Sequence, residues 1–184
     1  CDTVFYTKQT CYEGSSVQSF QFYLEHSGYS LDVLGVGSGG GEMDAQMLTL
    51  LQSTFPAVPI TADIVEGSSQ LTDNFKALVA KTTNLQKIPF AWYIMHSEDY
   101  ERQVKEKGDM KTFDFIHMIQ MIYYVDNLAD TIKFYHSLLK NNGRLMIIIE
   151  AGKPYVLDTR VKRGAELSTD HHLVVSWVRG WGKT

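Results

Sequence analysis

The sequence predicts a single α/β domain built on a doubly wound, mostly parallel sheet. Short apolar segments alternate with amphipathic ones from residue 31 to residue 149. The first apolar segment runs into a glycine-rich turn, and the second ends on an acidic residue. Strand–helix units in series form a parallel sheet covered by helices, because their crossovers are right-handed. A chain of 184 residues, 44% of them hydrophobic, can fill the core of one such Rossmann-like domain but not of two.

The first half of this domain is expected to hold two strands and two helices. The mostly apolar segments 31–36 and 60–65 predict buried strands. A helix is predicted over 41–53, and its core-facing residues at helical spacing are expected to be Met43, Met47, Leu50 and Leu51. The second helix starts after Ser68, a suitable N-cap. Its core-facing residues are expected to be Leu71, Phe75, Leu78 and Val79.

The second half continues the alternation. Strands are predicted at Phe90–Met95, Asp114–Gln120 and Leu145–Ile149. The charged run Glu98–Lys111 predicts an exposed helix and loop. A helix before the last strand is marked by Leu128, Ile132, Tyr135 and Leu139, and we expect Asn141-Asn142-Gly143 to close it.

The regular pattern defines three regions. Residues 1–30 form an N-terminal arm with one short helical candidate at Ser16–His26. Residues 31–152 form the domain. Periodicity stops there, and residues 153–184 carry six Lys and Arg against three acidic residues. We interpret this last region as a non-native tail on a C-terminally truncated domain, and the start at Cys1 rather than Met as the sign of a fragment.

Bulk composition excludes several classes of protein. A net charge of −4 does not indicate a nucleic-acid partner. Two cysteines make a disulfide framework or a zinc cluster improbable, and adjacent His171 and His172 lack a third metal ligand. No apolar run approaches a membrane span, and no leader opens the chain. We therefore expect a cytoplasmic protein without a metal site, a membrane anchor or a nucleic-acid partner.

The glycine-rich turn predicts a cofactor site. Gly37, Gly39 and Gly41 follow the first strand, and Glu66 ends the second, 25 residues after Gly41. Glycines allow positive φ and leave no Cβ between the main chain and a ligand. An acidic side chain at the end of the neighbouring strand can accept hydrogen bonds from ribose hydroxyls. The alternative is a purely structural glycine-rich turn that binds no ligand, and the position of Glu66 disfavours it.

The residue at position 42 indicates which of two cofactors, a dinucleotide or S-adenosylmethionine, suits the glycine-rich turn. A dinucleotide fingerprint ends in a small residue where this sequence has Glu42. A carboxylate at a helix N-terminus suits the helix dipole but repels a pyrophosphate. The pattern therefore favours S-adenosylmethionine, whose charged end carries an amino group and a sulfonium, and disfavours an NAD-dependent dehydrogenase.

Several stretches resemble histamine N-methyltransferases. The most specific is Asp114-Phe-Ile-His-Met-Ile-Gln-Met-Ile-Tyr-Tyr-Val125. The others are the loop Val33–Asp44, the segment Leu78–Leu85 with Phe90-Ala-Trp92 after it, and Lys133–Leu139. The resemblance covers roughly residues 16–150. It implies a class I S-adenosylmethionine-dependent methyltransferase, a histamine-like imidazole amine as substrate, and a monomer.

By position, the resemblance assigns roles to single residues. Those it assigns to the cofactor are Gly37, Glu66, Ser97 near the adenine, and Ile119. Gln120 and Tyr124 match groups that face the imidazole substrate. Tyr123 is better explained by core packing, and His117 by a packed histidine with a satisfied ring. No catalytic base is expected, because a neutral imidazole, with a pKa of about 6.5, is already nucleophilic; Gln120 and Tyr124 would orient it for in-line methyl transfer.

Two departures from the family leave other interpretations open. The family carries an acid that pairs with the substrate ammonium, and Tyr29 stands in its place here. The family also continues past the fifth strand into residues that complete the substrate pocket. The chain is therefore either an incomplete methyltransferase of histamine or of a related imidazole such as carnosine, or a non-catalytic cofactor-binding fragment.

The tail has a resemblance of its own. Residues 155–178 resemble the end of retrotransposon endonucleases of the exonuclease–endonuclease–phosphatase superfamily, where a pair such as Asp170-His171 orients a base beside a metal. The other metal and phosphate ligands of such a nuclease have no counterpart in this sequence. We therefore expect the tail to be a fusion or a gene-model artefact without nuclease activity.

Overall fold

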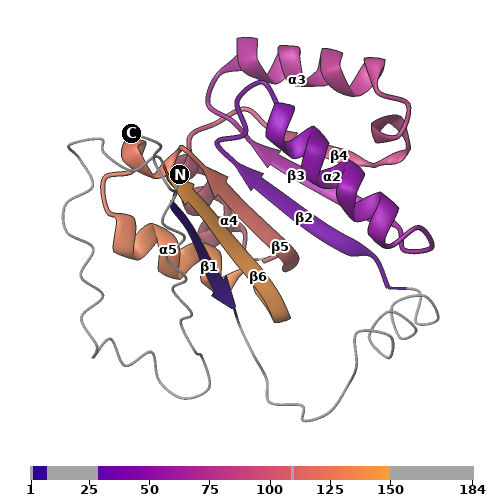
Figure 1. The fold of residues 1–184 in the computed structure, drawn as a ribbon. Helices are drawn as coiled ribbons and strands as arrows, with labels where there is room; N and C mark the ends of the chain where they lie inside the picture. Colours follow the sequence, from indigo (N-terminus) through magenta and orange to yellow (C-terminus); the bar gives the residue numbers. More distant parts are fainter. Residues whose placement is uncertain (1, 8–28, 109, 150–184) are drawn as a thin grey trace, which may run out of the picture.

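The computed structural model describes residues 2–7, 29–108 and 110–149, which form one six-stranded sheet in the order β1-β6-β5-β2-β3-β4 (Figure 1). The strands are β1 (Asp2–Thr7), β2 (Leu31–Val36), β3 (Ile60–Val65), β4 (Phe90–Tyr93), β5 (Phe113–Ile119) and β6 (Leu139–Ile149). Strands β2 to β6 are mutually parallel, and β1 is antiparallel to β6. The predicted doubly wound, mostly parallel sheet is confirmed.

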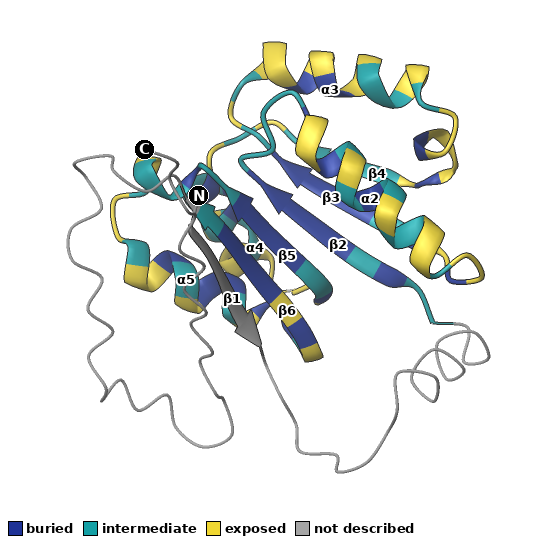
Figure 2. Cartoon of the chain, viewed as in Figure 1, coloured by how far each residue is buried: buried dark blue, intermediate teal, exposed yellow. Residues whose placement is uncertain are grey.

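Helices cover both faces of the sheet (Figure 1). They are α2 (Glu42–Thr54), α3 (Ser69–Lys81), α4 (Ser97–Lys107) and α5 (Leu128–Ser137), with short 3₁₀ turns η1 (Leu85–Lys87) and η2 (Ile122–Tyr124). Successive residues of a strand point to opposite faces. Accordingly Val33 packs in one core with α2 and α3, and Leu34 in the other with α4 and α5. Figure 2 shows the consequence: buried strands between helices with exposed outer surfaces.

Local sequence signals explain several element boundaries. β2 and β3 occupy the predicted segments 31–36 and 60–65. Ser68 caps α3 as predicted, since its hydroxyl oxygen accepts a hydrogen bond from the Leu71 backbone N–H at 3.3 Å. The charged run after β4 forms the predicted helix α4, whose polar face lies in solvent.

The predicted inner face of α2 is wrong at two of its four residues. Met43 and Leu50 are 44% and 65% exposed, whereas Asp44 and Leu48 are buried. Leu51 packs against the core as predicted, and Met47 is partly buried. The helix is rotated because Asp44 has a buried polar partner in the sheet. α3 differs in the same way: Leu71 is exposed, and Thr72 lies inward beside Phe75.

The segment Asn141-Asn142-Gly143 does not close a helix. α5 ends at Ser137, and β6 already begins at Leu139, which pairs with Phe113. The next pair in the ladder is Phe115 with Arg144, so the intervening residues of β6 form an irregularity, and Asn142 adopts a positive φ of 65°. Asn141, Asn142 and Gly143 therefore form an irregularity within β6 instead of a helix end.

Strand β1 was not predicted. It pairs residue for residue with β6, from Asp2 opposite Ile149 to Thr7 opposite Arg144. A segment of the N-terminal arm therefore covers the outer edge of β6, which would otherwise present unpaired backbone groups. The helical candidate Ser16–His26 and the tail 153–184 lie outside the described residues.

At the amino ends of the strands, one lysine joins two carboxylates. Lys140 Nζ lies 2.6 Å from Asp32 Oδ2 and 2.9 Å from Asp114 Oδ2. Burial by itself raises the pKa of Asp32, but the hydrogen bonds from Lys140 and Thr61 outweigh it and lower that pKa below its usual value. This network ties β2, β5 and β6 together on the side opposite the glycine-rich turn.

The described residues contain neither a membrane-spanning helix nor a metal-binding cluster. In residues 2–7, 29–108 and 110–149, no helix has the length and apolar character needed to cross a bilayer. The same residues contain no cluster of three or more His, Cys, Asp or Glu side chains able to hold a metal ion.

Candidate functional site

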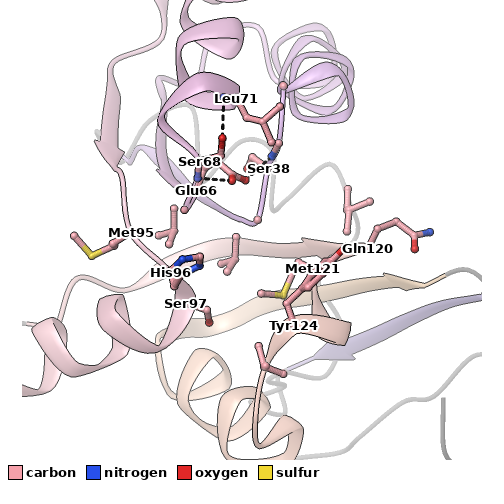
Figure 3. Close-up of a pocket in the computed structure, with 18 of the residues that line it drawn as sticks. Ser38, Glu66, Ser68, Leu71, Met95, His96, Ser97, Gln120, Met121 and Tyr124 are labelled. Atoms are coloured by element: carbon pink, nitrogen blue, oxygen red, sulfur yellow. Dashed lines mark hydrogen bonds between the residues drawn. The ribbon is translucent and has the colours of Figure 1, made fainter. Parts of the chain in front are cut away.

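A cavity of about 800 Å³ opens at the carboxyl ends of the strands (Figure 3). It is lined by the segments 36–40, 65–68, 95–98 and 119–121, together with Glu42, Leu71, Tyr124 and Val125. These segments follow β2, β3, β4 and β5. The chain crosses from β2 to β3 on one side, and β5 returns to the other side of β2. The cavity thus lies at the topological switch point, where open α/β sheets bind ligands.

The glycine loop forms one wall of the cavity. Gly37 and Gly39 both line it and have φ values of 67° and 57°. A Cβ on Gly37 would lie 2.5 Å from the Cβ of Met121, so the backbone packs directly on that side chain. A Cβ on Gly39 would have none of the described residues within 4 Å. The loop therefore offers bare backbone to whatever occupies the cavity.

Gly41, predicted with the other two, has a different place. It does not line the cavity; it is the N-cap of α2, with φ 82°, and a Cβ there would collide with the ring of Phe75. Gly41 is needed so that α2 can approach α3 closely.

Glu66 joins the glycine loop to α3. Its Oε2 accepts a hydrogen bond from the Gly39 N–H at 2.8 Å, and its Oε1 accepts one from the Ser68 N–H at 2.9 Å (Figure 3). An ionised carboxylate has about four lone-pair positions, so both oxygens keep acceptor capacity. Glu66 therefore fixes the loop and still offers acceptor sites in the cavity.

A buried polar cluster lies below the loop. Asp44 Oδ1 accepts a hydrogen bond from Ser38 Oγ at 2.8 Å and lies 3.1 Å from His117 Nε2. The Asp44 and His117 side chains are both 2% exposed. The prediction that His117 is a packed, satisfied histidine is confirmed. Sequence reasoning missed Asp44 and Ser38; the available signal was an acid placed among the apolar residues of α2.

Ser97 directs its hydroxyl away from the cavity. It is the first residue of α4 and lines the cavity, but its Oγ lies 3.1 Å from the Tyr135 hydroxyl in the core. Burial raises the pKa of Tyr135 above its usual value, so this phenol is a neutral partner for the serine. The neighbouring His96, which was not predicted, covers Gly67: a Cβ there would lie 2.7 Å from the imidazole.

The remaining predicted residues follow β5. Ile119, Gln120 and Tyr124 all line the cavity. Figure 3 shows Gln120 and Tyr124 across the cavity from Glu66 and Ser68. Gln120 has a positive φ of 56°, and its N–H donates to the Ile148 carbonyl at 2.8 Å. Positive φ is costly for a non-glycine residue and is found preferentially at functional sites. Tyr124 is 82% exposed at the mouth of the cavity.

The charge of the lining is one-sided. Glu42, Glu66 and Glu98 line the cavity, and the described lining includes no Lys or Arg. One carboxylate oxygen of Glu98 is buried without a hydrogen-bond partner among the described residues. Such a cavity attracts cationic ligands and repels phosphates.

Comparisons with known proteins agree with this geometry. A family profile described as "Methyltransferase domain" matches residues 15–174. Over 123 residues the chain is 45% identical to histamine N-methyltransferase of Cavia porcellus, covering 67% of this chain and 42% of that protein. It is 48% identical over 120 residues to carnosine N-methyltransferase 2 of Gallus gallus, covering 65% of this chain and 37% of that protein.

A solved structure supports the fold. The citrinin polyketide synthase CMeT domain superposes with a TM-score of 0.50 at 21% identity, covering 71% of this chain and 33% of that one. The chain spans less than half the length of the curated relatives named above. Because the family profile covers most of the sequence, including every element that lines the cavity, the chain belongs to the methyltransferase domain family.

Proposed function

We propose that the chain is the cofactor-binding part of an S-adenosylmethionine-dependent N-methyltransferase that acts on a small imidazole amine. The observation that carries the proposal is the contact between the glycine loop and Glu66, at the switch point of the sheet and in a cavity with acidic lining. The named relatives act on histamine and carnosine, and both molecules contain an imidazole ring.

The residues of the cavity fit this cofactor. Gly39 leaves open space where any other residue would place a Cβ, so a ligand can approach the main chain. Glu66 has lone pairs left for ribose hydroxyls. Glu42 curls back over Gly40, at the start of α2, and disfavours a pyrophosphate there. When bound, S-adenosylmethionine supplies a methyl group on a positively charged sulfur, and the acidic lining suits that charge.

The protein's own contribution to such a reaction is orientation and exclusion of water. His117 is buried and engaged with Asp44, so it is not a base for the substrate. A neutral imidazole nitrogen needs no base near pH 7. Gln120 and Tyr124 are the proposed orienting groups on the β5 side, and Ser97 and Ile119 the proposed walls beside the cofactor. Alignment in a closed, dry site contributes up to ~7–11 kcal/mol.

One observation favours a second candidate, a cofactor binder that does not turn over. Tyr29, in the place of the family's substrate acid, packs against the Lys140 ammonium at 4.7 Å and is not part of the cavity lining. The exposure of Tyr124 leaves the β5 side of the cavity open. An open site keeps the substrate amine hydrated, so most of the alignment is lost.

Two measurements test these candidates. Calorimetric titration with S-adenosylmethionine tests the cofactor, with NAD as the comparison ligand; tighter binding of NAD would contradict the proposal. Methyl transfer from radiolabelled cofactor to histamine and to carnosine tests turnover. We expect turnover far below the ordinary enzymatic value of ~10 per second. A value near that figure would exclude the non-catalytic candidate.

The setting of the protein is part of the same proposal. The low cysteine content supports a reducing, cytoplasmic compartment, and the net charge of −4 gives no support for a nucleic-acid partner. The small imidazole amine as partner is supported by the similarity to the histamine and carnosine methyltransferases, and a monomer is part of the same proposal. We keep residues 31–152 as the cofactor-binding domain and 153–184 as a region outside it. Gel filtration coupled to light scattering would test the monomer, and a mass of twice 20.9 kDa would refute it.

A further inference from the structure

A continuous line of polar contacts runs beneath and through the glycine loop. It starts at His117 on β5, passes through Asp44 on α2 to Ser38, and continues from the adjacent Gly39 to Glu66 at the end of β3. We propose that Asp44 is a positioning residue: through Ser38 and Gly39 it holds the Glu66 carboxylate in the orientation that binds the cofactor. This inference rests on the proposed cofactor.

The surroundings of Asp44 are arranged around its carboxylate. Asp44 is 2% exposed, and one oxygen, Oδ1, faces both the Ser38 hydroxyl and the His117 ring N–H. Asp44 also lies in the first turn of α2, where the helix dipole favours negative charge. A buried carboxylate is costly unless hydrogen-bond donors satisfy it. The donors come from a loop and from a strand 73 positions further along the chain, so the carboxylate links the two.

Gly35 makes room for this link. It lies within β2, and a Cβ there would lie 2.5 Å from Asp44 Oδ1, 2.5 Å from Ser38 Oγ and 2.9 Å from His117 Cε1. No side chain fits between the strand and the cluster. A glycine inside a strand weakens it, and it often marks a close approach of other groups. Here the group that approaches is the cluster that supports the loop.

One backbone bond also supports the loop at this point: the Ser38 carbonyl accepts a hydrogen bond from the Gly41 N–H at 3.0 Å. Among the described residues, nothing lies within 4 Å of a Cβ position on Gly39, so no side chain packs there. The ties of Ser38 and Gly39 to the side chains of other elements are the Gly39 N–H to Glu66 Oε2, at 2.8 Å, and the Ser38 hydroxyl to Asp44, at 2.8 Å. If Asp44 releases Ser38, the Gly39 N–H can turn away and Glu66 loses one of its two backbone donors. The orientation of the Glu66 carboxylate then changes.

The chain offers a matched control for a buried aspartate. Asp63 on β3 is 3% exposed and binds the Lys111 ammonium at 2.7 Å and the Tyr93 hydroxyl at 3.3 Å. It precedes Glu66 by three residues but does not line the cavity. Asp63→Asn therefore disturbs a buried acid in the strand that leads into Glu66, without touching the glycine loop.

The first measurement is calorimetric binding of S-adenosylhomocysteine to the full 184-residue chain. We expect Asp44→Asn to weaken binding by about tenfold or more, because one hydrogen bond to a charged group is lost from the line. Ser38→Ala keeps the buried pair of Asp44 and His117 and should weaken binding by about three- to tenfold. Asp63→Asn should change the affinity for S-adenosylhomocysteine by less than about twofold. This holds even if Asp63→Asn lowers the unfolding midpoint by as much as Asp44→Asn does.

The second measurement needs no ligand. Amide hydrogen exchange of the free protein should show the Gly39 N–H protected in the wild type and exchanging about tenfold faster or more in Asp44→Asn and Ser38→Ala, but unchanged in Asp63→Asn. A rescue check uses Ser38→Thr, which keeps the hydroxyl: wild-type Gly39 protection there supports a role of the hydroxyl itself.

The outcomes separate the two proposals. Unchanged Gly39 exchange in Asp44→Asn and Ser38→Ala would overturn the positioning role, whether or not ligand binds. Faster Gly39 exchange with unchanged S-adenosylhomocysteine affinity would also overturn the positioning role. The contact from Asp44 to Ser38 would then order the loop without affecting ligand binding. A wild type that binds no S-adenosylhomocysteine would refute the proposed function and with it the cofactor part of this role.

Discussion

The Glu66 carboxylate carries the most direct prediction. Glu66→Ala removes acceptors from the Gly39 and Ser68 N–H groups, at 2.8 and 2.9 Å, and from any ligand hydroxyl in the cavity. A hydrogen bond to a charged group contributes about 1.5–3 kcal/mol, so the lost ligand contact alone weakens S-adenosylmethionine binding by about ten- to a hundredfold. The two freed amides are partly accessible to water, so we expect a loss of about 1–3 kcal/mol in the free energy of unfolding.

Calorimetry and urea unfolding measure the two effects separately. Glu66→Gln keeps the size of the side chain but replaces one acceptor oxygen by an NH₂ group, which faces a backbone donor; we expect affinity between those of the wild type and Glu66→Ala. Glu106→Ala, an exposed acid on α4 outside the cavity, is the charge-matched control and should leave both quantities unchanged. Equal affinity of the wild type and Glu66→Ala would refute the assignment of Glu66 to the cofactor.

Three further predictions concern the loop, the sheet and the tail. Gly37→Ala should abolish tight cofactor binding and destabilise the protein by more than Gly108→Ala, because both glycines have φ near +66° but only at Gly37 does a Cβ meet another side chain. Lys140→Met should cost about 1.5–3 kcal/mol in urea unfolding at pH 7. The pKa of Asp32 is lowered in the folded protein, so that cost is present above the unfolded value of about 3.9 and shrinks as the pH falls through the folded pKa. Deletion of residues 153–184 should leave cofactor affinity unchanged in calorimetry.

Each of the three predictions would be contradicted by a specific result. Equal loss of stability for the two glycine variants would show that the positive φ, and not the contact with Met121, decides the effect. A Lys140→Met cost that persists at pH 2, where the two carboxylates are protonated, would assign the effect to the contact of the ammonium with the Tyr29 ring instead of the ion pairs. Loss of folding on deletion of the tail, or magnesium-dependent DNA cleavage that Asp170→Ala removes, would show that the tail has a role of its own.

Sequence reasoning located the candidate site because it depends on topology. Once β2, β3 and β5 are parallel strands of one sheet, their carboxyl ends meet at one edge, and the residues that follow them must gather there. Glu66, Gln120 and the glycine loop are all found at that edge. Short apolar segments and one capping serine were enough to fix this framework.

The errors arose where a distant partner decides the structure. The hydrophobic period of α2 placed Met43 and Leu50 inward, but the preference of Asp44 for the His117 ring and the Ser38 hydroxyl rotates the helix. Such a pairing of residues far apart in the chain leaves no trace in a local window. The same holds for β1, whose six residues become a strand only because β6 offers an unpaired edge.

The pairing of β1 with β6 also has a kinetic consequence. Asp2 lies opposite Ile149, so this ladder closes a loop of nearly the whole described chain, and closing a long loop costs conformational entropy before any contact offsets it. Strand β1 can pair only after β6 has docked beside β5 and presents its outer edge. The pairing of β6 with β5 is itself parallel and non-local. We therefore expect β1 to join last, although among the described strands it comes first along the chain. A folding stage in which β6 is formed while its outer edge is still open is the expected consequence.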